Sequence, residues 1–136
     1  MRAVLDPNVL IAGLLSPSGT PARLIVRWLA GDYELVVSEH LVEELGRVLA
    51  YPKIRARISQ DDADDFVERL RAHAAFATDP ARRASRSIDP DDDYLLALAE
   101  AEHAVLVSGE KHLLDLADAF PILSPREFSD TLESER

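Results

Sequence analysis

Four acidic residues occupy positions from which carboxylates could act together. Asp6 directly follows one short apolar run, and Glu110 follows another after a Ser-Gly turn, whereas Glu44 and Asp92 lie in stretches with helical periodicity. If these side chains converge, each pair repels by ~4 kcal/mol at 4 Å and an effective dielectric of 20. A divalent cation removes this penalty, and all-oxygen ligation favours Mg²⁺ or Mn²⁺ over zinc. Such a site activates water for phosphodiester hydrolysis.

The helical phases of Glu44 and Asp92 turn both side chains toward the protein interior. At ~100° per residue, Glu44 falls at the edge of an apolar stripe, and Glu43 falls nearly opposite it. That stripe consists of Leu41, Leu45, Val48 and Leu49. Asp92 projects onto the same face as a second apolar set, which consists of Leu95, Leu96 and Ala99. A carboxylate at either position requires a compensating partner, because burying an unpaired carboxylate is costly.

Each acid alone also has an ordinary structural explanation. Asp6 could cap the helix that follows it, Glu44 could pair with an arginine, and Glu110 could be a first-turn acid. Asp89 is a candidate N-cap, and the helix dipole favours Asp92 behind it. The combination favours a joint site, since two of the acids close strands and two turn toward the core from helices.

Short apolar runs alternate with helical stretches along the chain. The expected strands are 4–5, 35–37, 74–78, 105–107 and 121–123. Because these runs are continuously apolar and helices separate them, they predict a three-layer α/β/α sandwich around a four- or five-stranded parallel sheet. In such sheets ligands bind beyond the carboxyl ends of the strands. We expect one domain over residues 1–132 and a tail, 133–136, that frays.

Composition narrows the class of protein. The 136 residues include no cysteine, which excludes disulfides and thiolate zinc sites. No apolar run is long enough to cross a bilayer and no signal-peptide pattern is present, so we expect a cytoplasmic protein that does not enter the membrane. The net charge of −10 argues against simple electrostatic binding of nucleic acid. Basic clusters at 47–57 and 82–86 are candidates for phosphate contact.

Four segments together resemble the PIN-domain family, in particular its bacterial toxins. They run in family order, span nearly the whole chain, and comprise residues 4–11, 43–54, 89–99 and 107–114. The resemblance implies an α/β/α sandwich and a Mg²⁺- or Mn²⁺-dependent endonuclease that cleaves single-stranded RNA. It also implies a cognate antitoxin that wraps the toxin and blocks its acidic pocket, and a homodimer.

The resemblance assigns roles to individual residues. Asp6 and Asp92 would ligate the metal, and Glu44 would complete the site. Asn8 corresponds to an asparagine that supports the first acid, and Ser108 to a residue that hydrogen-bonds within the site.

Two residues depart from the family pattern. Glu110 stands where an aspartate is common, so its longer side chain would assist, by binding metal through water or by orienting the attacking water as Glu44 also could. Pro7 replaces a small polar residue and removes an N–H that could have faced the site.

The remaining candidates concern substrate and rival functions. Residues that could contact phosphate are Arg23, Arg27, Arg82, Arg83, Arg86 and Lys111. The four histidines have no metal-ligand spacing and are expected at the surface or the core margin. A catalytically inactive PIN scaffold that binds RNA or protein stays open because of Glu110. A receiver-like phosphoacceptor domain fits poorly, since Asp79 is a weak match for its acid and no lysine follows Leu123.

Overall fold

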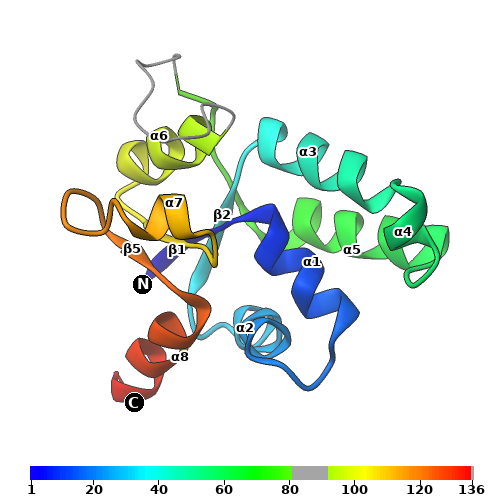
Figure 1. Cartoon of the computed structure of the whole chain (residues 1–136), viewed down its shortest axis with the longest axis horizontal. Helices are drawn as coiled ribbons and strands as arrows, with labels where there is room; N and C mark the ends of the chain where they lie inside the picture. Colours follow the sequence, from blue (N-terminus) through cyan, green and yellow to red (C-terminus); the bar gives the residue numbers. More distant parts are fainter. Residues whose placement is uncertain (81–91, 136) are drawn as a thin grey trace.

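Short runs rich in valine and leucine form the strands of one parallel sheet. The computed structural model describes residues 1–80 and 92–135 (Figure 1). Its strands are β1 (Arg2–Leu5), β2 (Glu34–Val37), β3 (Ala75–Phe76), β4 (Val105–Val107) and β5 (Ile122–Leu123). Every pairing is parallel, in the order β3-β2-β1-β4-β5. The predicted parallel sheet is therefore confirmed, with five strands.

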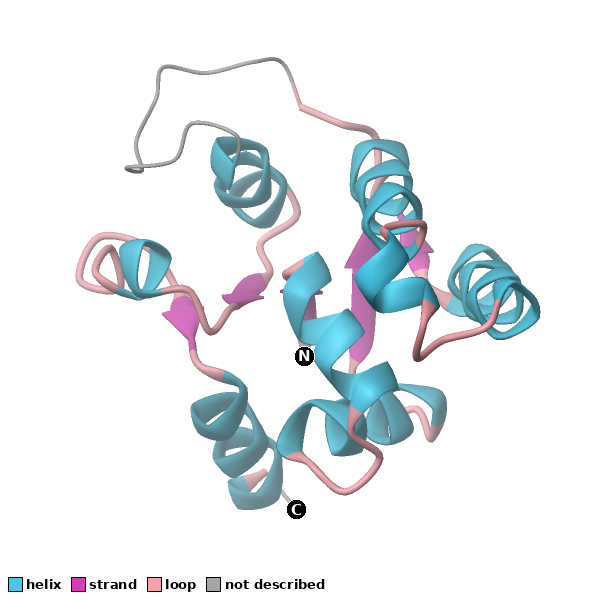
Figure 2. Cartoon of the chain, turned by 45° about the vertical axis from the view of Figure 1, so that its right-hand side comes forward, coloured by secondary structure: helices cyan, strands magenta, loops and turns pink. Residues whose placement is uncertain are grey.

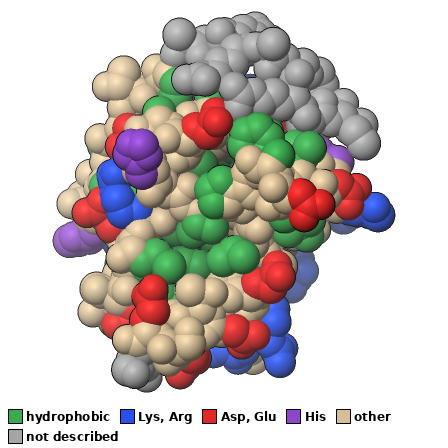
Figure 3. All heavy atoms as spheres, turned by 90° about the vertical axis from the view of Figure 1, so that its left-hand side faces the viewer, with side chains coloured by type: hydrophobic (Ala, Val, Ile, Leu, Met, Phe, Trp, Pro, Cys, Tyr) green, Lys and Arg blue, Asp and Glu red, His purple; other side chains and the backbone are tan. Residues whose placement is uncertain are grey.

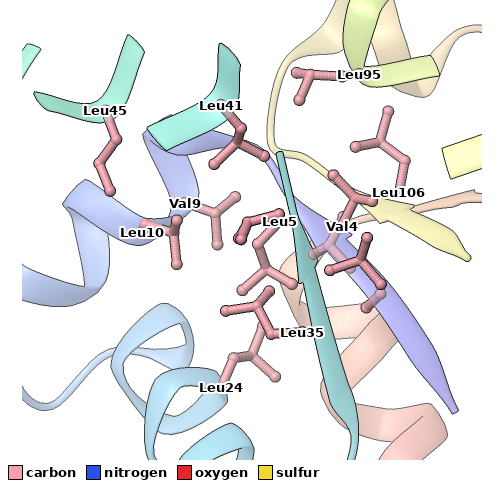
Figure 4. Packing of buried hydrophobic residues seen from close by; sticks show 14 of the residues in the cluster. Val4, Leu5, Val9, Leu10, Leu24, Leu35, Leu41, Leu45, Leu95 and Leu106 are labelled. Carbon is pink, nitrogen blue, oxygen red and sulfur yellow. The ribbon is translucent and has the colours of Figure 1, made fainter. Parts of the chain in front are cut away.

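The sheet is buried on both faces, as its continuously apolar strands require. Val4 and Leu5 of β1 are almost completely buried, and as successive strand residues they point to opposite faces. Figure 4 shows Leu5 on the side of the sheet that faces Val9, Leu10, Leu24 and Leu41. Val4 lies on the other side, with Leu106 and Leu95.

Helices cover both faces of this sheet, as Figure 2 shows. They are α1 (Pro7–Leu15), α2 (Thr20–Leu29), α3 (Glu39–Leu49), α4 (Pro52–Arg55), α5 (Gln60–His73), α6 (Asp93–Ala101), α7 (Lys111–Leu114) and α8 (Pro125–Ser134). Helix α1 contacts α2 and α3, and α3 contacts α5, whereas α6 packs on β1 and β4. Helices α7 and α8 contact β5, and α8 also contacts α2. Within the described ranges, no single helix could span a bilayer by length and apolarity; only α1 and α2 together, bent by 101°, pass that test.

Local signals set several helix boundaries. The Ser38 hydroxyl accepts a hydrogen bond from the Leu41 N–H (3.3 Å) and begins α3. Gly31 adopts a φ of 85°, a left-handed conformation that suits glycine, in the turn between α2 and β2. Helix α8 continues through Ser134, so two residues of the tail that we expected to fray are helical. Glu133 also accepts a hydrogen bond from the Arg27 guanidinium (2.8 Å).

The strand order reverses between β1 and β4, and this is the feature that positions the candidate site. The chain moves from β1 through β2 to β3 on one side, and then crosses to β4 and β5 on the other. In doubly wound sheets such a reversal opens a crevice beyond the carboxyl ends of the two central strands. Asp6 follows β1 at this edge, and Ser108 follows β4.

Candidate active site

Asp6 is a buried carboxylate at the carboxyl end of β1. Only 3% of its surface is exposed. One oxygen, Oδ1, accepts a hydrogen bond from the Asn8 N–H (3.0 Å), and Oδ2 accepts one from the Ser108 hydroxyl (2.8 Å). The first bond caps α1, in which Pro7 is the first residue. The capping explanation therefore holds for one oxygen, while the other is turned to the end of β4.

A closed ring of hydrogen bonds joins the ends of β1 and β4. The Asn8 side-chain amide donates to Glu110 Oε1 (3.1 Å), and the Glu110 N–H donates to the Ser108 hydroxyl (3.1 Å). Together with the two bonds to Asp6, these contacts link four residues in a circle. Glu110 therefore lies beside Asp6, although 102 residues separate it from Asn8 in sequence.

The electrostatics of this edge are unfavourable without a cation. The pKa of Asp6 is raised from 3.8 to about 6, chiefly by burial and to a smaller extent by the neighbouring charges of Asp92 and Glu110. The hydrogen bonds from Asn8 and Ser108 act in the opposite direction. The same interactions show that Asp92, from a distant part of the chain, lies close enough to affect the Asp6 carboxyl group.

Glu44 lies on α3 and contacts Tyr94 of α6. It is half-buried while Glu43 is exposed, as the helical phase predicts. Its Oε2 accepts a short hydrogen bond from the Tyr94 hydroxyl of α6. Burial and the bond to Glu44 raise the pKa of Tyr94, and the nearby charges of Asp6 and Asp92 also contribute. Tyr94 therefore stays protonated and donates to Glu44, within range of the charges of Asp6 and Asp92.

Asp92 stands at the start of α6, where its side chain is 17% exposed. Its Oδ2 lies 2.7 Å from Nε2 of His112 in α7. This half-buried pair ties the start of α6 to α7. Asp89, the predicted cap, lies outside the described residues, as do Pro90 and Asp91.

The donor set fits a hard divalent cation. Asp6, Glu44, Asp92 and Glu110 supply only carboxylate oxygens, the ligands that Mg²⁺ and Mn²⁺ prefer, and a cation would offset the repulsion that raises the Asp6 pKa. Among the described residues, however, no three acidic or imidazole side chains already form a metal cluster. Glu44 and Asp92 are instead bonded to Tyr94 and His112.

A comparison with protein families decides what kind of domain this is. The sequence pattern of the PIN domain matches residues 2–112. The chain belongs to the PIN-domain family. The resemblance drawn from the four sequence segments is thereby confirmed.

Relatives of this PIN domain are distant in sequence. The uncharacterized protein MJ1680 of Methanocaldococcus jannaschii is 22% identical, over 98% of this chain and 92% of the relative. Among solved structures, PAE2754 from Pyrobaculum aerophilum has a TM-score of 0.69 at 15% identity, covering 98% of this chain and 90% of that one.

Two further solved structures share the fold. One is VapBC2 from Rickettsia felis bound to a DNA fragment from their promoter, with a TM-score of 0.63 at 16% identity. The other is FitAcB from Neisseria gonorrhoeae, with a TM-score of 0.58 at 18% identity. In each case 91% of this chain and 98% of the other are covered. At such identities the likeness establishes the fold of this PIN domain.

The described phosphate-contact candidates of the PIN domain are bonded to other groups of the protein. Arg23 bonds to Ser18 in the loop before α2 and to Thr20, the first residue of α2, beyond the end of α1 that is remote from Asp6. Arg27 is paired with Asp32 and Glu133. Lys111 is 88% exposed and pairs with Asp115. Arg82, Arg83 and Arg86 lie outside the described residues.

Sequence reasoning missed three residues of this region: Tyr94, His112 and His40. Tyr94 lies two residues beyond Asp92, at the start of α6. The spacing of the histidines gives no signal for a metal site and none for their contacts here. His112 is half-buried as a core-margin residue can be, but its bond to Asp92 joins residues 20 apart in sequence. His40 had a usable signal, because it lies four residues before Glu44 on the same helix.

Proposed function

We propose that this PIN domain is a Mg²⁺- or Mn²⁺-dependent endonuclease that cleaves single-stranded RNA. The observation that carries the proposal is the buried Asp6 carboxylate, whose pKa is raised by burial and by the charges of Asp92 and Glu110. A protein tolerates such a group most readily where a cation compensates it or where it performs chemistry. Membership of the PIN family supports the nuclease assignment.

The residues of this chain would have two roles, metal binding and the positioning of the metal ligands. Asp6 and Asp92 would hold the cation, with Glu44 completing its ligands and Glu110 assisting. When bound, the cation supplies an activated water and stabilises the leaving oxygen of the phosphodiester. Ser108 and Asn8 fix the Asp6 carboxylate through the bonds at 2.8 and 3.0 Å, and Tyr94 fixes Glu44. Asn8 also holds Glu110, which limits where that longer side chain can point.

We also propose that the protein is the toxin of a type II toxin–antitoxin pair in the cytoplasm. Its fold likeness to a chain of VapBC2, which was solved with a DNA fragment from their promoter, supports a protein partner that acts with it. An antitoxin segment that covers the edge beyond β1 and β4 would block the acids. Self-association as a homodimer belongs to the same proposal.

The decisive experiment measures cleavage of a 5′-labelled single-stranded RNA with Mn²⁺, with Mg²⁺ and with EDTA. We expect metal-dependent cleavage by the wild type, and a loss of about a hundredfold or more in Asp6→Asn and Glu44→Gln. Glu43→Gln is the matched control, because Glu43 adjoins Glu44 but is exposed. A folded wild type that binds RNA without cleaving it would overturn the nuclease assignment in favour of a binding scaffold.

The toxin assignment has its own test in a bacterial host. Induced expression of the wild type should arrest growth, while Asp6→Asn at equal protein level should not. Equal growth of the two strains would contradict an active toxin even if purified protein cleaves RNA.

A further inference from the structure

An aromatic pair stands at the rim of the candidate active site. The His40 and Tyr94 rings are stacked, with centroids 3.9 Å apart and planes 9° from parallel. His40 and Glu44 are four residues apart on α3, so they lie on the same side of that helix. Tyr94 contacts both, since its ring covers His40 while its hydroxyl donates to Glu44. Only the Tyr94 ring therefore separates the His40 imidazole from the Glu44 carboxylate.

The His40 side chain combines exposure with a contact on one ring face. Tyr94 is half-buried, whereas His40 is exposed, and Tyr94 occupies one face of the imidazole. The His40 backbone is held independently, because its N–H donates to Asp79 Oδ2 (3.1 Å). A fixed, parallel aromatic pair with one exposed member has the form of a stacking platform.

The charge of the protein makes such a platform useful to a nuclease. With a net charge of −10, the chain gains little affinity for RNA from its overall field. The described cations among the phosphate-contact candidates lie elsewhere or are paired with acids. Stacking of unpaired bases on aromatic side chains supplies affinity that does not depend on net charge.

We propose that the face of His40 turned away from Tyr94 stacks an unpaired base of RNA beside the phosphate that is cleaved. The proposal rests on the proposed nuclease function and deepens it, because a base can reach this platform only when it is not paired. His40 would thus be a substrate-binding residue that selects single strands. The four-residue step from His40 to Glu44 places that base next to the acids.

The first test uses the fluorescence of 2-aminopurine, which falls when this base stacks. A uridine-rich oligoribonucleotide carries one 2-aminopurine, scanned over successive positions, and is titrated with protein in Ca²⁺; gels verify that the RNA stays intact. We expect quenching at one or two positions with the wild type, and its loss in His40→Ala. His40→Phe should restore the quenching, and His73→Ala, at another exposed histidine, should leave it unchanged.

A double-mutant cycle separates stacking from any effect of His40 on Tyr94. Removing the base at the quenched position should weaken binding by the wild type about tenfold, but should leave binding by His40→Ala nearly unchanged. If base removal weakens binding equally in both proteins, or if no position is quenched, the platform is refuted. Cleavage assays on the same proteins distinguish the two proposals. Cleavage without His40-dependent quenching refutes the platform alone, and quenching without cleavage refutes the nuclease alone.

Discussion

At the scale of single residues, the buried carboxylate of Asp6 carries an electrostatic penalty. It is buried between the ends of two strands and is satisfied by hydrogen bonds, yet its pKa is raised to about 6. Two hydrogen bonds therefore do not replace the water that burial removes, and neighbouring carboxylates add repulsion. The charged Asp6 carboxylate should therefore lower the stability of the metal-free protein, as groups in functional sites often do.

Because of this penalty, the effect of Asp6→Asn on the free energy of unfolding should depend on pH. Between about pH 4 and pH 6, the folded protein holds a proton on Asp6 that the unfolded chain has released, so this group makes stability fall as pH rises. Above pH 6 the penalty is complete, at about 3 kcal/mol. In EDTA, Asp6→Asn should therefore raise the free energy of unfolding by about 3 kcal/mol at pH 8 and by almost nothing at pH 4.

Urea denaturation at a series of pH values measures this difference directly. Glu43→Gln, which removes an exposed charge from α3, serves as the control and should show no comparable trend. An Asp6→Asn variant that is less stable than the wild type at pH 8 would contradict the electrostatic account of this residue.

A second prediction at this scale concerns the effect of the Tyr94 hydroxyl on catalysis. Tyr94→Phe removes the hydroxyl that donates to Glu44 but keeps the ring that stacks on His40. We expect kcat for RNA cleavage to fall about tenfold, because Glu44 loses its orientation, with KM changing little. A larger change in KM than in kcat would show that the hydroxyl acts on substrate binding instead.

At the scale of elements, the crossing of α1 and α2 depends on one glycine. A Cβ added at Gly13 would lie 3.1 Å from the backbone carbonyl of Pro21 and 2.6 Å from Cδ1 of Ile25. The isoleucine can move, but the backbone at the start of α2 cannot do so without shifting the helix. Gly46, in the interior of α3, has no atom within 4 Å of such a Cβ.

Replacing each of these two glycines by alanine should have opposite effects on the stability of the protein. Gly46→Ala should stabilise the protein by about 0.5–1 kcal/mol through helix propensity. Gly13→Ala gains the same propensity but should destabilise the protein by about 1 kcal/mol, because overpacking at Pro21 outweighs it. Thermal unfolding of both variants measures the difference; a stabilised Gly13→Ala would show that α1 and α2 can separate freely.

The elements were the part of the molecule that sequence patterns predicted best. Continuous apolar runs indicated the parallel strands, and the helical phase distinguished half-buried Glu44 from exposed Glu43. The contacts of Tyr94 and His112 were not predictable in this way, because each joins helices that are distant in sequence. Periodicity shows which face of a helix is buried but not which helix it meets. For the same reason Arg27 could not be placed: its charge indicated phosphate contact, and only the packing of α2 on α8 pairs it with Glu133.

At the scale of the whole molecule, acidic residues outnumber basic ones, and the net charge is −10. Figure 3 shows acidic side chains at several separate places on one face, around an area of hydrophobic side chains. The topology nevertheless gathers particular acids, because the reversal of strand order places the ends of β1 and β4 side by side. Local concentration of charge thus follows from the fold and not from composition.

This distribution predicts a weak salt dependence of RNA binding. If about three cations contact phosphates, the slope of log K against log salt should be near −2 for a single strand. Fluorescence anisotropy with labelled RNA, in Ca²⁺ and at increasing KCl, gives the slope. A slope steeper than about −5 would mean that an extended basic surface dominates binding, contrary to the stacking account.

We propose that Asp6 and Asp92, brought together by the fold, hold a divalent cation. Titration of the protein with Mn²⁺, followed by the electron paramagnetic resonance signal of the free ion, tests this claim without requiring a substrate. We predict that the wild type and Glu43→Gln bind Mn²⁺ alike, and that Asp6→Asn and Asp92→Asn bind it at least about tenfold more weakly. Equal Mn²⁺ affinity in all four proteins, or no binding by the wild type, would show that Asp6 and Asp92 do not hold the cation.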